Sequence, residues 1–80
     1  MNPEVVAVRP RPDYCLLVTF DNGETRVFDV KPFLNFPVFQ RLQTPGYFDR
    51  AHVENGTVVW DAQLDVSPDT LYLQGVPAQA

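Results

Sequence analysis

Cys15 and His52 are the only cysteine and the only histidine in the chain, and together they could supply a nucleophile and its base. Such a pair needs hydrogen-bond contact and a thiol that ionises readily. Cys15 directly precedes the apolar run Leu16-Leu17-Val18, where cysteine usually behaves as a small hydrophobic residue. We therefore expect neither residue to be catalytic, and we predict that the chain is not an enzyme.

Acidic residues provide the other candidate chemistry. Asp61, Asp65 and Asp69 recur at a spacing of four, which on a continuous helix would place three carboxylates on one face. The proline before Asp69 argues against such a helix, and the segment lacks the dense acids and the glycine of an EF-hand loop. Asp29 lies between two apolar residues, and we expect it to bond the nearby backbone or Lys31. The sequence therefore predicts no metal ligand and no cofactor.

The composition indicates one globular domain over residues 1–80, because 45% of the residues are hydrophobic and 12% are aromatic. The net charge is −4, and the six basic residues are scattered and do not form the stripe that nucleic-acid phosphates require. No apolar run approaches the roughly 20 residues that span a membrane. The N-terminal residues lack the pattern of a signal peptide, and a single cysteine cannot form an internal disulfide, so we expect a cytoplasmic protein.

The clearest element is a hairpin of two strands, residues 14–20 and 24–30, around Asp21-Asn22-Gly23. A two-residue loop of Asn22 and Gly23 would place the carboxylates of Asp21 and Glu24 side by side, which is unfavourable. A three-residue loop that ends in a left-handed Gly23 places Phe20 opposite Glu24. That register gathers five apolar residues on one face: Leu16, Val18, Phe20, Phe28 and Val30. We favour the three-residue loop because a one-residue slip would divide this set.

The remaining pattern predicts an α+β fold with a small, mostly antiparallel sheet. A valine-rich strand over residues 4–9 comes first, and Asn55-Gly56 forms the turn of a second hairpin with strands over residues 50–54 and 57–60. Prolines and capping residues predict short helices over residues 37–42, 45–48 and 68–73. These helices are too short to be stable alone, so we expect them to pack on one face of the sheet. Residues 76–80 are expected to be a frayed tail.

Several short motifs occur in an order that is similar to a known bacterial family. They include Phe20-Asp21-Asn22-Gly23-Glu24, Pro37-Val38-Phe39, Gly56-Thr57-Val58-Val59-Trp60 and Pro68-Asp69-Thr70-Leu71-Tyr72. Over nearly the whole chain this order resembles the "domain of unknown function 2442" family. The resemblance implies a small α+β domain without established catalytic residues. It also implies that some longer members carry a helix-turn-helix domain after this one, and that others are encoded beside a second small protein, as in toxin–antitoxin pairs. The chain lacks the helix-turn-helix segment, so we expect no direct binding of nucleic acid.

Both faces of the central strands are apolar. Adjacent pairs such as Leu16 with Leu17 place hydrophobic side chains on opposite sides of a strand. A half-buried strand should alternate, whereas a strand covered on both sides is apolar throughout. The chain has helical material for only one face, so we expect a partner to cover the other. The residues predicted to meet that partner are Leu17, Val27 and Val59.

These observations favour a non-enzymatic protein-interaction module, which would act as a homodimer or as the acidic partner of a protein encoded nearby. One alternative is DNA-linked regulation through such a partner, which a gel shift with and without the partner would detect. A second alternative is a small ligand-binding domain or enzyme. A melting temperature that stays unchanged across a panel of metabolites and metals would argue against it.

Overall fold

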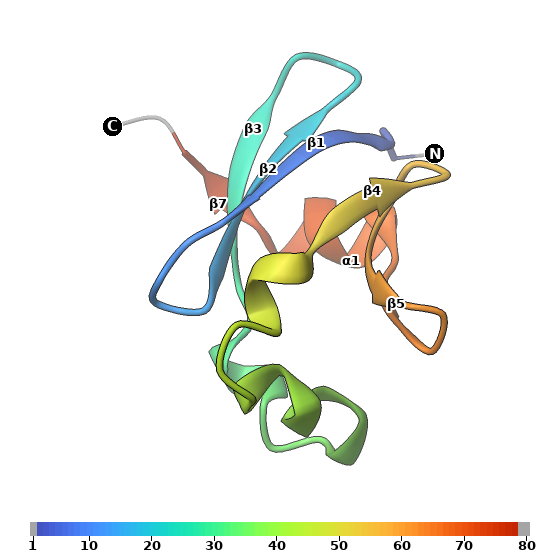
Figure 1. Cartoon of the computed structure of the whole chain (residues 1–80). Helices are drawn as coiled ribbons and strands as arrows, with labels where there is room; N and C mark the ends of the chain where they lie inside the picture. The colour runs from blue at the N-terminus through green and yellow to red at the C-terminus, as the bar shows by residue number, and fades with distance from the viewer. Residues whose placement is uncertain (1, 79–80) are drawn as a thin grey trace.

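Two antiparallel sheets and four short helices make up the computed structural model, which describes residues 2–78 (Figure 1). The first sheet has the order β1-β2-β3-β7, with β1 at Val5–Pro10, β2 at Cys15–Phe20, β3 at Thr25–Asp29 and β7 at Val76–Pro77. The second has the order β4-β5-β6, with β4 at His52–Glu54, β5 at Thr57–Asp61 and β6 at Leu64–Val66. The 3₁₀ helices are η1 (Lys31–Phe33), η2 (Pro37–Gln43) and η3 (Phe48–Arg50), and the α-helix α1 is Pro68–Gln74. The α+β class is confirmed, although the two predicted hairpins lie in separate sheets.

The β2–β3 hairpin has the predicted three-residue loop. The Phe20 amide donates to the Glu24 carbonyl at 2.8 Å, and Gly23 is left-handed with φ +88°. Leu16 therefore lies opposite Phe28 in the register of the two strands. All five residues that this register was predicted to gather on one face are at most 2% exposed: Leu16, Val18, Phe20, Phe28 and Val30.

The second hairpin has the register that a two-residue Asn55-Gly56 turn requires, with Val53 opposite Val58 and His52 opposite Val59. It is extended by β6, a strand that the sequence analysis missed. Leu64 and Val66 of β6 are buried while the residue between them is exposed, which is the alternation of a half-buried strand. Three residues are too few for this alternation to be recognised in the sequence alone.

The helices follow the predictions in part. The segment predicted as a helix over residues 37–42 forms η2, and α1 begins as expected where the Thr70 amide donates to the Ser67 hydroxyl at 3.2 Å. The helix predicted over residues 45–48 is wrong, because that segment is mostly turn and the next helix, η3, starts only at Phe48. Gly46 has φ +83°, a left-handed conformation that interrupts a helix at this point.

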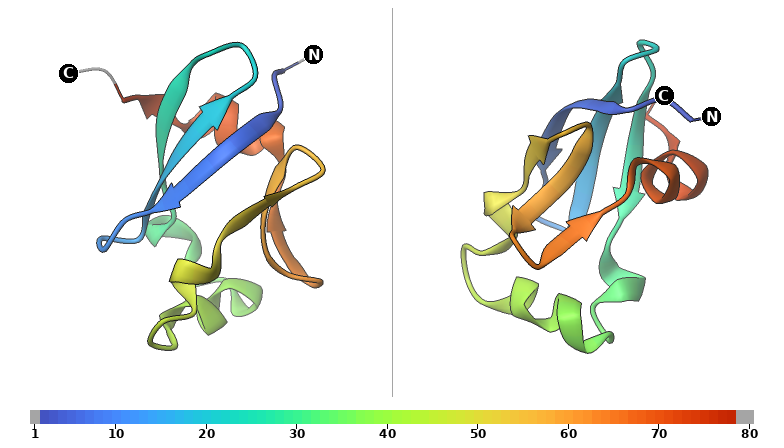
Figure 2. Two further views of the ribbon diagram at one scale, coloured as in Figure 1. Left: turned by 45° about the horizontal axis from the view of Figure 1, so that its top comes forward. Right: turned by 90° about the vertical axis from the view of Figure 1, so that its right-hand side faces the viewer.

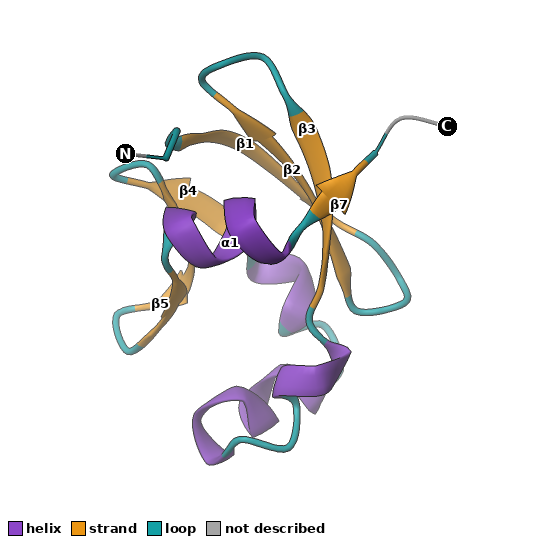
Figure 3. Cartoon of the chain, turned by 180° about the vertical axis from the view of Figure 1, so that it is seen from behind, coloured by secondary structure: helices purple, strands orange, loops and turns teal. Residues whose placement is uncertain are grey.

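The C-terminal segment is paired and not frayed, so that prediction is wrong for residues 76–78. Figure 3 shows β7 beside β3, directly after α1. Val76 lies opposite Val27, and the Ala78 amide donates to the Thr25 carbonyl at 3.0 Å. Residues 79 and 80 of the predicted tail lie outside the described residues.

The core lies between the two sheets. We call the side of the first sheet that carries Leu16, Val18 and Phe28 its inner face, and the opposite side, which carries Leu17 and Val27, its outer face. The inner-face residues belong to one buried cluster with residues of the second sheet, of the helices and of the connections: Leu42, Phe48, Val58, Trp60, Leu64, Val66 and Leu71. The right view of Figure 2 shows the second sheet lying over β2 and α1 beside β3. The inner face is thus covered by a second sheet as well as by helices, where only helices were predicted.

Candidate interaction surface

Cys15 does not have the surroundings of a nucleophile. It is only 9% exposed, and its Sγ lies 3.9 Å from Asp29 Oδ1 and 3.8 Å from Lys31 Nζ. Burial, with the nearby negative charge of Asp13 as the next cause, raises the pKa of the thiol. The thiol therefore stays protonated at neutral pH, and the protonated form is a poor nucleophile.

His52 lies in the other sheet and has its own partners. Its Nδ1 is 2.9 Å from the Arg50 carbonyl oxygen and its Nε2 is 2.6 Å from a carboxylate oxygen of Glu54. These contacts raise the pKa of His52, with the Arg50 carbonyl as the larger cause. Cys15 and His52 are each bonded elsewhere, so the structure does not bring together the one thiol–imidazole pair that the sequence offers.

The three spaced acids are also separated, since Asp61 ends β5, Asp65 lies in β6 and Asp69 lies in α1. Among residues 2–78 there is no group of three or more acidic, histidine or cysteine side chains that could hold a metal ion. Asp61 instead accepts hydrogen bonds from Tyr47 and, at 2.9 Å, from Arg41. The Tyr47 hydroxyl is the main reason that the pKa of Asp61 falls from 3.8 to about 2. This carboxylate ties the end of β5 to η2 and to the turn before η3.

Asp29 has the local role that was predicted for it. Its carboxylate accepts a hydrogen bond from the Lys31 amide at 2.9 Å and forms an ion pair with Lys31 Nζ at 3.1 Å. The bond from the Lys31 amide is the largest cause that lowers the pKa of Asp29. The side chain is 49% exposed, so it remains accessible from the outer face.

The outer face carries a continuous row of side chains across all four strands of the first sheet. Arg9 lies opposite Leu17, Leu17 opposite Val27, and Val27 opposite Val76. Leu17 and Val27 are half-buried and Val76 is 60% exposed. In the left view of Figure 2, β1, β2 and β3 lie side by side with α1 behind them and no described element in front. Three adjoining apolar side chains on such a face form a candidate contact surface.

The next row along the strands is polar and small. Ala7 lies opposite Thr19, and Thr19 lies opposite Thr25, with the two threonine hydroxyls 3.5 Å apart. Both threonines are half-buried. The outer face therefore has an apolar centre with a polar margin, which is the usual composition of a protein–protein contact.

The three residues predicted to meet a partner lie in two different sheets. Leu17 and Val27 are direct cross-strand neighbours on the outer face. Val59 lies in β5 of the second sheet, opposite His52 and Asp65, and is only 9% exposed. It borders a depression of about 370 Å³ that is otherwise lined mainly by polar and acidic residues. The predicted single contact surface is therefore wrong for Val59, while its other two members adjoin each other.

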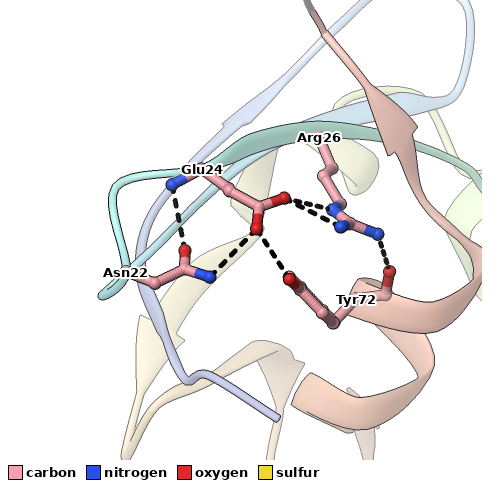
Figure 4. A network of polar contacts seen from close by, with 4 residues as sticks. All are labelled: Asn22, Glu24, Arg26 and Tyr72. Carbon is pink, nitrogen blue, oxygen red and sulfur yellow. Dashed lines mark hydrogen bonds and ion pairs between the residues drawn. The ribbon is translucent and has the colours of Figure 1, made fainter.

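A polar network that the sequence analysis missed fastens α1 to β3 (Figure 4). Arg26 lies over the ring of Tyr72 at 3.8 Å from the ring centroid and forms an ion pair with Glu24 at 2.8 Å. The Tyr72 hydroxyl donates to Glu24 at 2.7 Å, and Asn22 donates to the same carboxylate at 3.1 Å. The Tyr72 bond is the main cause that lowers the pKa of Glu24. The spacing of two residues between Glu24, just before β3, and Arg26 in β3 was the only available sign of this network. We interpret it as structural.

A second apolar feature lies on the helical segment, the part of the chain with η1, η2 and η3 that connects β3 to β4. The Phe33 ring packs on Phe28, Phe36 and Phe39, with centroids 5.4, 6.0 and 5.8 Å away. Phe36 is 52% exposed and Val38 is 44% exposed. Phe36 precedes η2 in extended backbone and Val38 lies in η2, whereas the outer face joins four hydrogen-bonded strands. The more rigid and continuous surface is the better candidate for binding.

The fold and the surface define a small α+β domain whose first sheet carries an apolar row on its outer face. The chain belongs to the family described as "Protein of unknown function (DUF2442)", whose model matches residues 5–77 and confirms the resemblance seen in the sequence. Comparison with curated proteins and with solved structures gives no match. Within residues 2–78, no helix has both the length and the apolar character needed to cross a bilayer.

Proposed function

We propose that this domain is a non-enzymatic protein-interaction module that binds its partner through the outer face of the first sheet. The observation that carries the proposal is the row Leu17, Val27 and Val76, which lies on a face that no described element covers. Complete burial of a valine or leucine side chain is worth about 1.5–3 kcal/mol. Leu17 and Val27 are already half-buried, so a partner that covers the row gains only part of this free energy from each of them and more from Val76, which is 60% exposed.

The partner is a protein, either a second copy of the chain or the product of an adjacent gene, in a toxin–antitoxin-like pair. The net charge of −4 favours a basic protein in the second case. A cytoplasmic location accords with an unpaired cysteine. The separation of Cys15 from His52, and the raised pKa of the thiol, support a role without catalysis.

The proposal is tested by measuring binding of the purified protein to itself and to the purified product of the adjacent reading frame. Leu17→Asp places a charge in the centre of the outer face, and Phe36→Asp is the matched control on the helical segment. We expect Leu17→Asp to abolish the complex that the wild type forms and Phe36→Asp to retain it. Val27→Thr, which is milder, should weaken the same complex if Leu17→Asp folds poorly.

Two results would contradict the proposal. One is a complex that keeps its affinity in both outer-face variants, since the contact would then lie elsewhere. The other is a clear rise of the melting temperature with a metabolite or a metal, which would favour a ligand-binding or enzymatic role.

A further inference from the structure

We propose that the outer face of the first sheet binds a second copy of the same chain, face to face, about a two-fold axis that runs parallel to β2. This inference rests on the proposed interaction function and names its partner. The residues that carry it are Leu17 at the centre, the edge residues Arg9 and Arg11, and Asp29 on β3.

The register of the sheet decides which axis is favourable. β1 and β3 flank β2, so an axis that is parallel to β2 and lies above it, midway between the two outer faces, places β1 of each copy over β3 of the other. Leu17 then meets Leu17 of the second copy, because it lies on β2 itself. Arg9 lies opposite Leu17 on β1 and therefore faces Val27 of the second copy. The two leucines thus occupy the centre of the contact, where interfaces are most apolar, and the aliphatic part of Arg9 can cover Val27 of the second copy.

Charge distinguishes this axis from the alternative. An axis perpendicular to the strands would place Arg9 against Arg9 of the second copy, and like charges in contact are unfavourable. The parallel axis instead brings the β1 edge, where the Arg11 amide bonds the Cys15 carbonyl, over the β3 position of Asp29, which lies opposite Cys15. Neither Arg9 nor Arg11 has an ion pair within residues 2–78, and Asp29 is 49% exposed with Lys31 as its ion-pair partner. Asp29 can therefore accept a second cation.

The size of the face predicts a weak dimer. The four strands, spaced about 4.8 Å apart with about five residues of about 3.3 Å each, give each copy a flat face of roughly 300 Å². Two such faces lie well below the buried area of about 1,200–2,000 Å² in stable complexes. The chain has its own buried core, so a monomer in reversible equilibrium with a dimer is the expected behaviour.

Cross-linking at the axis tests the proposal. The double variant Cys15→Ser/Leu17→Cys carries one thiol at the centre of the proposed contact, and Cys15→Ser/Leu73→Cys carries one on α1, where Leu73 is 69% exposed. Diamide oxidises two thiols to one disulfide and takes up the two electrons and two protons as the hydrazine. We expect the Leu17→Cys protein to form a covalent dimer about tenfold faster than the control, because association raises the local thiol concentration.

A second measurement uses the unmodified contact. Sedimentation equilibrium of the wild type should show a monomer–dimer equilibrium, and Asp29→Asn should weaken it about two- to fivefold, the effect of losing an exposed ion pair. Asp29→Asn retains an oxygen that can accept from the Lys31 amide. Asp65→Asn, on the second sheet, is the matched control and should leave the equilibrium unchanged.

Equal cross-linking rates in the two cysteine variants, or a wild type that remains monomeric at millimolar concentration, would overturn the second copy as partner. Neither result would remove the proposed interaction function. In this experiment that function fails if the complex with the product of the adjacent reading frame is also absent or is insensitive to Leu17→Asp.

Discussion

Leu16 and Leu17 are neighbours of the same type, yet the fold treats them in opposite ways. Leu16 is 0% exposed and lies opposite Phe28 on the inner face, beneath the second sheet. Leu17 is half-buried and lies opposite Val27 on the outer face. The inner face accounts for the stability of the domain. The outer face carries a shorter apolar row without a cover, and this difference is the basis of the proposed binding.

The C-terminal segment adds to the contrast. A tail that folded across the first sheet would have hidden Leu17 and Val27. Instead, β7 pairs beside β3 in the plane of the sheet and places Val76 next to Val27. The last described strand therefore extends the apolar row of the outer face and does not cover it.

The largest effect is expected from exchanging the two leucines for alanine one at a time. Leu16→Ala should lower the free energy of unfolding by about 2–5 kcal/mol, because it leaves a cavity in a closed core. Leu17→Ala, its matched control, should lower it by less than about 1 kcal/mol. Urea denaturation measures both. Equal losses would mean that the outer face is covered in solution, and the comparison would fail.

The next effect concerns the turn that assigns the two leucines to their faces. Gly23→Ala should lower the free energy of unfolding by about 1–2 kcal/mol, the cost of a left-handed residue that has a Cβ. No atom lies within 4 Å of the added Cβ, so the loss is one of backbone conformation alone. An Asp21→Ala variant, which keeps both Asn22 and Gly23, is the control. An unchanged free energy of unfolding in Gly23→Ala would imply a different loop, with a register that places Leu17 on the inner face and Leu16 on the outer face.

A smaller effect is expected from the loss of stability at low pH, which depends on a contact of the second sheet and not on the outer face. Asp61 helps to hold the second sheet to the helical segment, and its pKa is lowered from 3.8 to about 2. A lowered pKa means that the stabilisation is complete above pH 3.8 and is lost as the pH falls towards 2. Thermal melts over this range should show a decline in the wild type that is shallower in Asp61→Asn. Parallel curves for the two proteins would contradict the role of Asp61.

The smallest effect is expected at His52, which belongs to neither face of the first sheet. Its pKa is raised from 6.5, so its contribution to stability is complete below pH 6.5 and is lost as the pH rises through the raised value. The side chain and its partner Glu54 are exposed, so the effect should be close to the limit of detection. His52→Gln should remove the small slope between pH 6 and 8 in melting temperature. A melting temperature that falls more steeply with pH in the variant than in the wild type would contradict the expected loss of stability on deprotonation of His52.

The sequence predicts local structure better than assembly. Turn chemistry was sufficient for the register at Asn55-Gly56, because such a turn admits few registers. At Gly23 the turn left two registers, and the apolar pattern of the flanking strands decided between them. The strands β6 and β7 were missed because their three and two residues are too few to show a period. The apolar character of both strand faces was visible in the sequence, but which strands share a sheet depends on long-range packing. For that reason Leu17 and Val27 share a face as expected, whereas Val59 lies in the second sheet.

The most direct test of the outer face as the binding surface is an amide chemical-shift map of the labelled protein. The spectrum would be recorded over a dilution series and then during titration with the product of the adjacent reading frame. We expect the shifts to concentrate at Leu17, Thr19, Thr25 and Val27, with Leu71 and the Trp60 indole unchanged. Shifts confined to the helical segment around Phe36, or none in either experiment, would contradict the proposed function.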